Sequence, residues 1–222
     1  SFGPVYEDSD RDYALFFEKA AALFGTLIPG NGLSILNATG RTRGGLVASK
    51  TPLDGLPGQT IFRASGEREY ATRVGDVPPL VLSPLAKCVV PPYGLSSLSV
   101  SASHLENAAI CVRFDAAGRV TSILDKQRKR ELLKRGAVAN RLQAFRDMPA
   151  QFDAWDIDSD FEDQSFEIDD LVSVKVVEEG PLRAAIRFEW RYERSSIVQV
   201  VSLEASARQI EFDTLIDWHE HN

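Results

Sequence analysis

The feature that most constrains the fold is a period of two in the hydrophobic pattern near the end of the chain. Between residues 182 and 192 an apolar side chain stands at nearly every second position, with charged side chains between them. The pattern is repeated over residues 210–218. Because successive side chains of a β-strand point to opposite faces, this alternation predicts strands that bury one face. We expect Ile186 and Phe188 in a core and Arg187 in water.

Shorter apolar segments, separated by glycine and proline, precede these strands. Their lengths and spacing are typical of an antiparallel β-sandwich, so we expect an all-β fold. Asp115-Ala116-Ala117-Gly118 predicts a hairpin turn, in which glycine supplies the positive φ. Residues 37–45 predict a turn-rich connection, and another strand opens at Asn140. The remaining predicted strands cover residues 33–37, 59–64, 70–74, 77–82, 85–90, 95–100, 108–114, 119–124, 171–179 and 196–204.

The beginning of the chain has a different period. Apolar side chains at helical spacing predict one amphipathic helix over residues 10–24, capped by Asp10 and ended by Gly25. One helix cannot bury its own apolar stripe, so it lies against the sheets or belongs to a bundle. The predicted parts are an N-terminal helix, as the stub of a helical bundle, in residues 1–30, a small β-domain in 31–100 and a larger β-domain in 101–222.

Composition excludes several classes of function. The net charge of -7 leaves no basic footprint for nucleic acid, which is therefore not an expected partner. No apolar run reaches the roughly 18 residues of a membrane span, and the first residues lack the pattern of a signal peptide, so we expect neither a membrane span nor a signal peptide. The two cysteines, Cys88 and Cys111, lie in apolar segments and are expected to be reduced, which suits a cytoplasmic protein.

The stretch from residue 140 to 158 is the candidate functional site. After a break at Asp147 it becomes an acidic loop that carries Asp153, Trp155 and Asp156. Carboxylates accept hydrogen bonds from hydroxyls and an indole stacks on the C–H face of a pyranose, so this composition suits sugar recognition. The alternative is a solvated acidic loop with Trp155 as its hydrophobic plug.

The other two tryptophans and the histidines allow simpler explanations. Trp190 and Trp218 stand on the apolar faces of their strands, which predicts core packing rather than ligand stacking. His219 and His221 point the same way along a strand, but a structural zinc site needs about four ligands. We therefore predict no metal site. No nucleophile with a supporting base is evident, so no catalytic residue is predicted.

An ordered set of short motifs gives the chain a family resemblance over residues 101–222, and more loosely over 33–98. In order and spacing the set resembles glycoside hydrolase family 38, the zinc-dependent α-mannosidases, in the region C-terminal to their catalytic domain. The motifs are Leu105-Glu106-Asn107, Asp115-Ala116-Ala117-Gly118, Ser122-Ile123-Leu124-Asp125-Lys126, Arg130-Glu131-Leu132, Asn140, Asp147-Met148-Pro149, Asp153-Ala154-Trp155-Asp156, Gly180-Pro181-Leu182-Arg183 and Asp217-Trp218-His219-Glu220.

The resemblance implies a non-catalytic β-region of a larger retaining mannosidase. It implies a galactose mutarotase-like supersandwich for residues 101–222, truncated at its C-terminal end. Zinc, nucleophile and acid would belong to an upstream α/β catalytic domain, and the substrate would be a mannose-containing glycan. Trp155 best matches an aromatic that the family presents beside the bound sugar, with Asp153 and Asp156 as neighbours, while Asn140 and Asp147 would orient the loop.

A second interpretation is a free-standing carbohydrate-binding or protein-interaction module without chemistry. The two differ in whether a reading frame with His and Asp motifs extends several hundred codons upstream. The oligomeric state stays open, and a homo-oligomer is compatible with the sequence.

Overall fold

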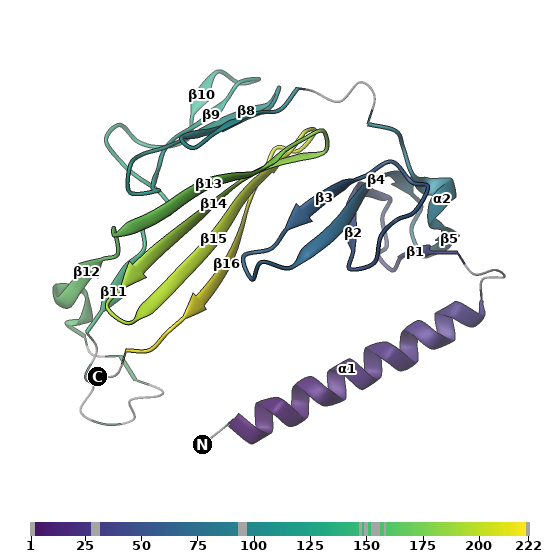
Figure 1. Cartoon of the computed structure of the whole chain (residues 1–222), viewed down its shortest axis with the longest axis horizontal. Helices are drawn as coiled ribbons and strands as arrows, with labels where there is room; N and C mark the ends of the chain where they lie inside the picture. The colour runs from purple at the N-terminus through teal and green to yellow at the C-terminus, as the bar shows by residue number, and fades with distance from the viewer. Residues whose placement is uncertain are drawn as a thin grey trace. The chain divides into compact units, whose positions relative to one another are not determined.

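The computed structural model describes residues 3–27 (side chains from residue 6), 32–92, 97–146, 148, 151, 156–157 and 159–220. Antiparallel strands dominate it, with one long N-terminal helix (Figure 1), so the predicted all-β sandwich class is confirmed. The chain divides into two compact units, one made of Ser1–Gly45 with Val74–Val90 and the other of Leu46–Arg73 with Pro91–Asn222. The predicted division at residues 30 and 100 stays a prediction.

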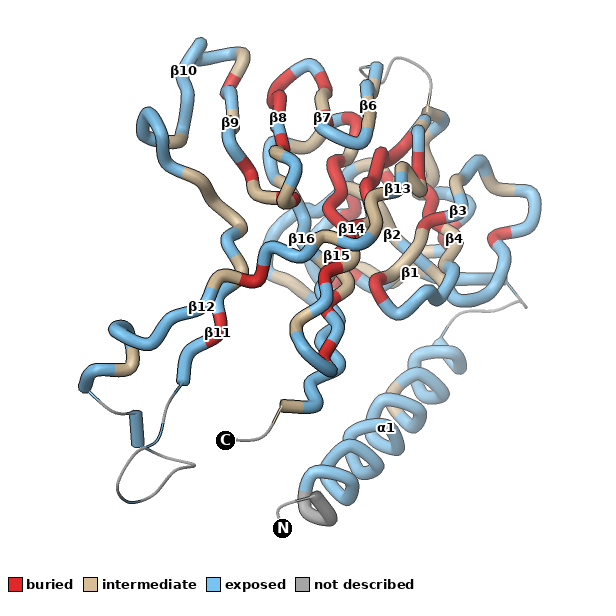
Figure 2. The backbone as a smooth tube through the Cα atoms, turned by 60° about the vertical axis from the view of Figure 1, so that its left-hand side comes forward, coloured by how far each residue is buried: buried red, intermediate tan, exposed pale blue. Residues whose placement is uncertain are grey.

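Helix α1 (Gly3–Thr26) begins earlier than the sequence pattern predicts. Pro4 stands in its first turn, where proline is tolerated, so Asp10 lies inside the helix rather than capping it. The aromatic stripe is exposed, with Phe16 and Phe17 at 65% and 67%. Figure 2 shows the described part of the helix exposed along almost its whole length.

The rest of the first unit is a small ribbon around a buried asparagine. Strand β1 (Ser34–Asn37) pairs with β5 (Val81–Pro84). The side-chain amide of Asn37 donates to the carbonyl oxygens of Arg41, Val77 and Pro78 at 2.8–3.0 Å. One side chain therefore holds the turn after β1 against the segment that precedes β5. The predicted connection over residues 37–45 is too long, because a strand begins at Arg43.

The predicted strand over residues 85–90 is wrong. Residues 85–88 form one helical turn, α2 (Leu85–Cys88), in which the N–H of Val89 donates to the carbonyl of Leu85. Only Leu85 of the four is buried, so the segment has no continuous strand face to bury. The preceding Pro84, with φ of -57°, suits the entry to a helical turn.

A three-stranded sheet of order β2-β4-β3 follows, and the sequence pattern misses its first strand because glycines interrupt it. A Cβ at Gly44 would lie 2.9 Å from the carbonyl oxygen of Gly75, so the strand needs glycine there for close approach. The three strands are β2 (Arg43–Ser49), β3 (Gln59–Phe62) and β4 (Arg68–Val77).

Two larger antiparallel sheets form the sandwich of the second unit. A five-stranded sheet has the order β10-β9-β8-β7-β6, and a four-stranded sheet has the order β13-β14-β15-β16. Their strands are β6 (Ser99–Ser101), β7 (His104–Glu106), β8 (Ile110–Phe114), β9 (Val120–Asp125), β10 (Arg130–Glu131), β13 (Leu171–Glu179), β14 (Arg183–Tyr192), β15 (Ser195–Glu204) and β16 (Ile210–Asp217).

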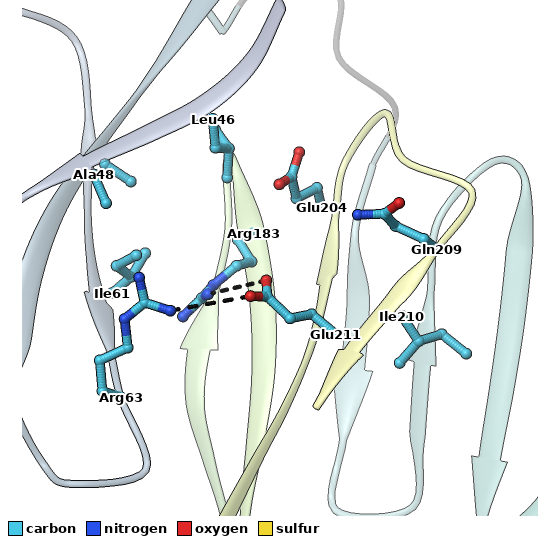
Figure 3. Close-up of a pocket in the computed structure, with 10 residues that line it drawn as sticks. Leu46, Ala48, Ile61, Arg63, Arg183, Glu204, Gln209, Ile210 and Glu211 are labelled. Atoms are coloured by element: carbon cyan, nitrogen blue, oxygen red, sulfur yellow. Dashed lines mark ion pairs between the residues drawn. The ribbon is translucent and has the colours of Figure 1, made fainter. Parts of the chain in front are cut away.

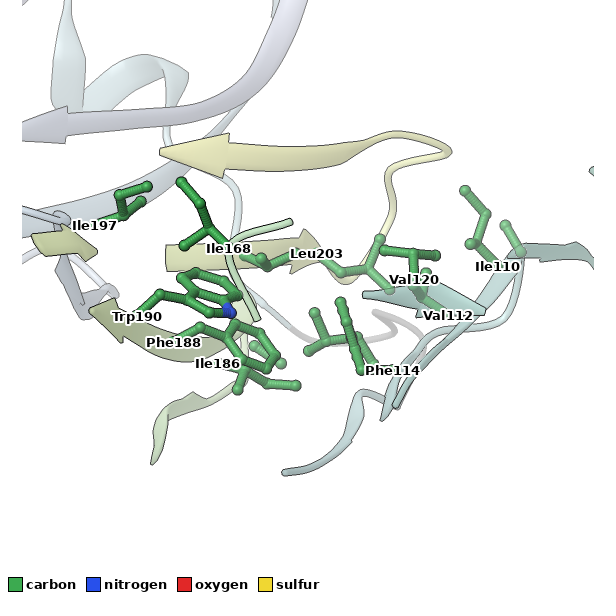
Figure 4. Packing of buried hydrophobic residues seen from close by; sticks show 14 of the residues in the cluster. Ile110, Val112, Phe114, Val120, Ile168, Ile186, Phe188, Trp190, Ile197 and Leu203 are labelled. Carbon is green, nitrogen blue, oxygen red and sulfur yellow. The ribbon is translucent and has the colours of Figure 1, made fainter. Parts of the chain in front are cut away.

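The main core lies between these two sheets (Figure 4). Ile186 and Phe188 of β14 are fully buried, as the alternation predicts. Trp190 is 2% exposed, and its ring stacks on Phe188 with a centroid distance of 5.6 Å. The 115–118 turn joins β8 to β9, with Gly118 at a φ of 79° as predicted.

The opposite face of β14 is also covered, because the small sheet packs there. Gln59 of β3 donates to the carbonyl of Arg183 at 2.7 Å and accepts from the N–H groups of Leu182 and Arg183. Glu178 forms a buried bidentate pair with Arg183 and accepts the N–H of Phe62 at 2.8 Å. Arg183 therefore stands on the polar side of the alternation but is buried.

The prediction that Trp218 packs in the core is wrong. Its side chain, directly after strand β16, is 47% exposed. Among the described residues β16 pairs only with β15, and only Ile210 of this strand packs on the main core. The core-side residues Phe212 and Ile216 are 40% and 56% exposed. Trp218 instead stacks on Tyr192 with a centroid distance of 5.6 Å.

Candidate functional site

A short antiparallel ribbon carries the acidic loop. Strand β11 (Gln143–Phe145) pairs with β12 (Ser165–Glu167), and a 3-10 turn, η1 (Phe161–Gln164), leads into β12 (Figure 1). The N–H of Arg146 donates to the carbonyl of Gln164 at 3.0 Å, which closes the ribbon where the loop begins. The rings of Phe145 and Phe161 meet there with a centroid distance of 5.2 Å. The two ends of the loop are therefore held side by side.

The base of the ribbon is fixed to the sandwich by buried apolar side chains. Ala144 and Ile168 are buried members of the main core. The N–H of Ile168 donates to the carbonyl of Leu142 at 3.0 Å. The predicted strand at residue 140 begins only at Gln143, because Asn140 adopts a φ of 54°. Asparagine tolerates this left-handed conformation better than most residues do.

An ion-pair network adds to this anchorage. Arg119 contacts Glu167 of β12 at 2.7 Å and Asp115 of the hairpin turn at 2.8 Å, while Arg141 reaches Glu167 at 3.0 Å. The hydrogen bond from Arg119 holds the pKa of Glu167 below its usual value. Burial opposes ionisation of Asp115, but bonds from the side chain and backbone of Arg119 and the N–H of Ala117 outweigh it and lower the pKa of Asp115.

Asn140 is tied to the four-stranded sheet. Its amide donates to the side-chain oxygen of Gln199 at 2.8 Å, and Gln199 in turn donates to the hydroxyl of Thr214 at 2.9 Å. Gln199 is buried. Just before the ribbon, the chain is thus hydrogen-bonded to β15 and, through Gln199, to β16. The sequence gives no local signal for Gln199 or Thr214, which stand at ordinary core-side positions of their strands.

Of the predicted sugar-contacting residues, only Asp156 lies in the described part of the chain. Asp156 is exposed, and its carboxylate accepts the N–H of Ile157 at 3.1 Å. Asp147, Asp153 and Trp155 lie outside the described residues. Of the five candidates, the structure places Asn140 against the sheet and Asp156 in solvent.

The histidine-rich end shows an ordinary polar arrangement. His219 pairs with Asp217 at 3.0 Å, and Glu220 accepts hydrogen bonds from the hydroxyl of Ser195 and the N–H of Arg194. His221 lies outside the described residues. Across the part of the chain that the structure describes, no group of three or more His, Cys, Asp or Glu side chains is placed to hold a metal ion.

Comparison with known proteins identifies a family for the part of the chain that contains this site. The family model described as "Glycosyl hydrolases family 38 C-terminal domain" matches residues 105–222, which contain the ribbon and most of the sandwich. The chain belongs to glycosyl hydrolase family 38. The resemblance seen in the sequence motifs is therefore confirmed. The family 38 match begins in β7, so α1 and the ribbon around Asn37 lie before it.

The chain is also similar to proteins named alpha-mannosidases. Alpha-mannosidase 2C1 of Homo sapiens is 33% identical over 118 residues, which are 52% of this chain and 11% of that protein. Its Mus musculus counterpart is 32% identical over 118 residues. Alpha-mannosidase G of Dictyostelium discoideum is 24% identical over 174 residues, covering 62% of this chain and 16% of that protein. The chain thus spans less than a fifth of the length of these relatives. None of the helices that the structure describes is long and apolar enough to cross a membrane.

Proposed function

We propose that this chain is a non-catalytic β-region of an α-mannosidase-type hydrolase, in which the loop beyond Asn140 completes the sugar site. The observation that carries the proposal is the anchored ribbon inside the region that matches the family model. The whole enzyme would cleave α-mannosidic bonds of a mannose-containing glycan. Its catalytic domain would be the direct partner of this region.

The proposed division of labour follows from the contacts of the loop. Trp155 would stack on the sugar ring, and Asp153 and Asp156 would accept hydrogen bonds from its hydroxyls. Asn140 and Asp147 would orient the loop from behind. The exposure of Asp156 and the bond from Asn140 to Gln199 support these roles. A loop whose two ends are held together can present its tip with little loss of conformational entropy.

Zinc belongs in this proposal only to the whole enzyme. The described residues do not fit a zinc site, because no three of their His, Cys, Asp or Glu side chains are placed to bind one ion together. Zinc, when bound by the catalytic domain, would polarise and position the sugar hydroxyls. The present chain would contribute shape and hydrogen-bond acceptors.

A cytoplasmic setting is part of the same proposal. Cys88 and Cys111 are both free, and Cys111 is buried in the five-stranded sheet. Burial raises the pKa of the Cys111 thiol, which keeps it protonated and unreactive. Free thiols are typical of reducing compartments.

Two activity assays test the proposed function. The isolated 222-residue chain should not hydrolyse an aryl α-mannoside, with or without added zinc. In the full-length enzyme, Trp155→Ala should lower kcat/KM roughly five- to thirtyfold, as expected for a lost stacking contact of about 1–2 kcal/mol.

A thermal-shift measurement separates this function from a purely structural role. The same Trp155→Ala change should leave the Tm of the isolated chain nearly unchanged. A large drop in Tm would make Trp155 a packing residue of the loop. Hydrolysis of the aryl α-mannoside by the isolated chain would contradict the non-catalytic role, provided that the activity co-purifies with the protein.

A further inference from the structure

A cavity of about 420 Å³ lies in the second unit, between the small sheet and the four-stranded sheet. Its polar wall comes from positions far apart in the chain: Arg63 after β3, Arg183 at the start of β14, Glu204 at the end of β15, and Glu211 in β16 (Figure 3). The volume is in the range of small-molecule sites. None of the described residues between 140 and 158 lines it, so the cavity is separate from the described part of the site proposed above.

Two guanidinium groups form the fixed part of the wall. Arg183 is bound by Glu178 at 2.5 and 2.7 Å, and Arg63 is bound by Glu69 at 2.6 and 2.8 Å. Each arginine is therefore held in place by one carboxylate. In each case the remaining nitrogen, Nη1, points to Glu211 at 4.0 Å, which is too long for a hydrogen bond. Figure 3 shows both guanidinium groups on the same side of this carboxylate, each joined to it by a dashed line. Both Nη1 groups can donate to a ligand.

Glu204 supplies an acceptor that the fold leaves unused. Its side chain is half-buried, and within the described part of the chain its carboxylate has no hydrogen bond or ion pair. Burial, and then the charge of Glu211, raise the pKa of Glu204. Leaving a partly buried carboxylate without donors costs free energy, and a ligand hydroxyl would remove that cost. Gln209, also in the wall, adds an amide that both donates and accepts.

The mixture of charges selects the class of ligand. An anion would meet Glu204 and Glu211, and a small cation would meet Arg63 and Arg183. Metal ions are not favoured, because the described residues offer no group of three suitable ligands. A neutral molecule with several hydroxyls satisfies both kinds of group, since each hydroxyl donates and accepts.

We propose that this cavity binds a neutral sugar through adjacent hydroxyls. Arg63 and Arg183 donate from Nη1, and Glu204 and Glu211 accept. Apart from Gln209, the remaining wall is apolar and includes Ile61 of the small sheet, which suits the C–H face of a pyranose.

The test is an amide-NMR titration of the isotope-labelled 222-residue chain with methyl α-D-mannopyranoside. Amides of residues 61–63 and 204–211 should shift and saturate in the millimolar range, which is usual for single small sugars that make few contacts. Sodium sulfate and methylammonium chloride are the anionic and cationic probes and should not saturate these shifts. Saturation by either ion with none by the sugar would overturn the assignment to a neutral ligand.

Matched variants tie the binding to the unused carboxylate. Glu204→Met replaces it with an unbranched side chain that lacks its acceptor, and should weaken sugar binding by roughly tenfold. Glu162→Met, at an exposed position of η1, should bind as the unaltered chain does. If Glu204→Met does not give a folded spectrum, Glu211→Met, at a half-exposed position, takes its place with the same expectation. Unchanged affinity in the folded variant, or equal loss in Glu162→Met, would overturn the proposal.

Discussion

The indole N–H of Trp190 donates a 2.9 Å hydrogen bond to the carbonyl oxygen of Ala117, across the core of the sandwich. Trp190 belongs to the four-stranded sheet, and Ala117 to the hairpin turn of the facing sheet. The next residue in that turn, Gly118, touches the indole so closely that a Cβ there would lie 2.5 Å from a ring carbon. One tryptophan thus fixes both the position of the turn and the identity of its last residue.

Gly118→Ala should destabilise the chain more than a glycine substitution at a similar backbone angle elsewhere. Gly136 is the matched control, because its φ of 78° equals that of Gly118 within a degree and a Cβ there meets nothing within 4 Å. Gly136→Ala should cost about 1 kcal/mol from backbone strain alone. Gly118→Ala should cost roughly 1–3 kcal/mol more, since the indole must move. Equal losses in denaturant unfolding would show that the turn does not press on Trp190.

The register of β14 can be checked by truncating neighbouring side chains. Ile186→Ala and Phe188→Ala should each cost roughly 2–5 kcal/mol, because both side chains are fully buried in the main core. Arg187→Ala, between them, should cost under about 1 kcal/mol, since its partner Glu189 lies on the same partly exposed face. Urea unfolding of the three variants is the measurement. A loss at Arg187 as large as that at Phe188 would contradict this register.

The buried pair of Arg183 and Glu178 predicts a large one-sided effect. Arg183→Ala should cost about 3–5 kcal/mol, because it leaves the carboxylate of Glu178, itself only 1% exposed, without its cation. Lys50→Ala is the exposed control: Lys50 and Glu67 are 3.2 Å apart, with side chains 73% and 57% exposed. It should cost under about 1 kcal/mol. Similar unfolding free energies for the two variants would mean that water reaches Glu178.

The pH dependence of stability should report Glu204. Burial and Glu211 raise its pKa above the ordinary value of 4.5, against the smaller opposing effects of Arg183 and Arg73. A carboxyl whose pKa is raised by folding stabilises the fold below the unfolded pKa, and this contribution is lost as the pH rises through the folded pKa. The Tm of Glu204→Met minus the Tm of the unaltered chain should therefore be larger at about pH 7 than at about pH 4.

Asp115 provides the opposite sign in the same experiment. Its pKa is lowered below the ordinary value of 3.8 because the bonds from Arg119 and Ala117 outweigh burial. Its stabilisation is present above the unfolded pKa and is lost as the pH falls through the folded pKa. Asp115→Asn should thus be most harmful at neutral pH and lose its effect in acid. Parallel pH profiles for the two variants would contradict this assignment.

The sequence predicts the long strands well, because the alternation of apolar and polar residues within each strand shows which face is buried. The alternation from 182 to 192 identifies the core face of β14, and the predicted strand over 171–179 has the bounds of β13. The same alternation misjudges Trp218, because periodicity shows which face is apolar but not whether another sheet covers it. It also misjudges Arg183, whose covering sheet comes from residues more than a hundred positions earlier.

The candidate site was predictable only as far as its local composition. An acidic loop with one aromatic can be recognised in the sequence, and so can its family resemblance. The bond from Asn140 to Gln199 has no such signal, since the partners are 59 residues apart. The cavity between the two sheets is even harder to predict from the sequence. Its four charged residues stand on separate strands or strand ends, and only Arg183 belongs to one of the motifs.

The polar contacts that hold the small sheet to the sandwich have a consequence for synthesis of the chain. The N–H of Phe62 is paired by Glu178, and that of Ala64 by Asp213, 149 residues later. At ordinary translation rates those partners emerge on the order of ten seconds after the small sheet does. During that interval β3 has an unpaired edge, which is the kind of surface that neighbouring nascent chains can extend. The edge of β3 is therefore covered only after β13 and β16 have been made.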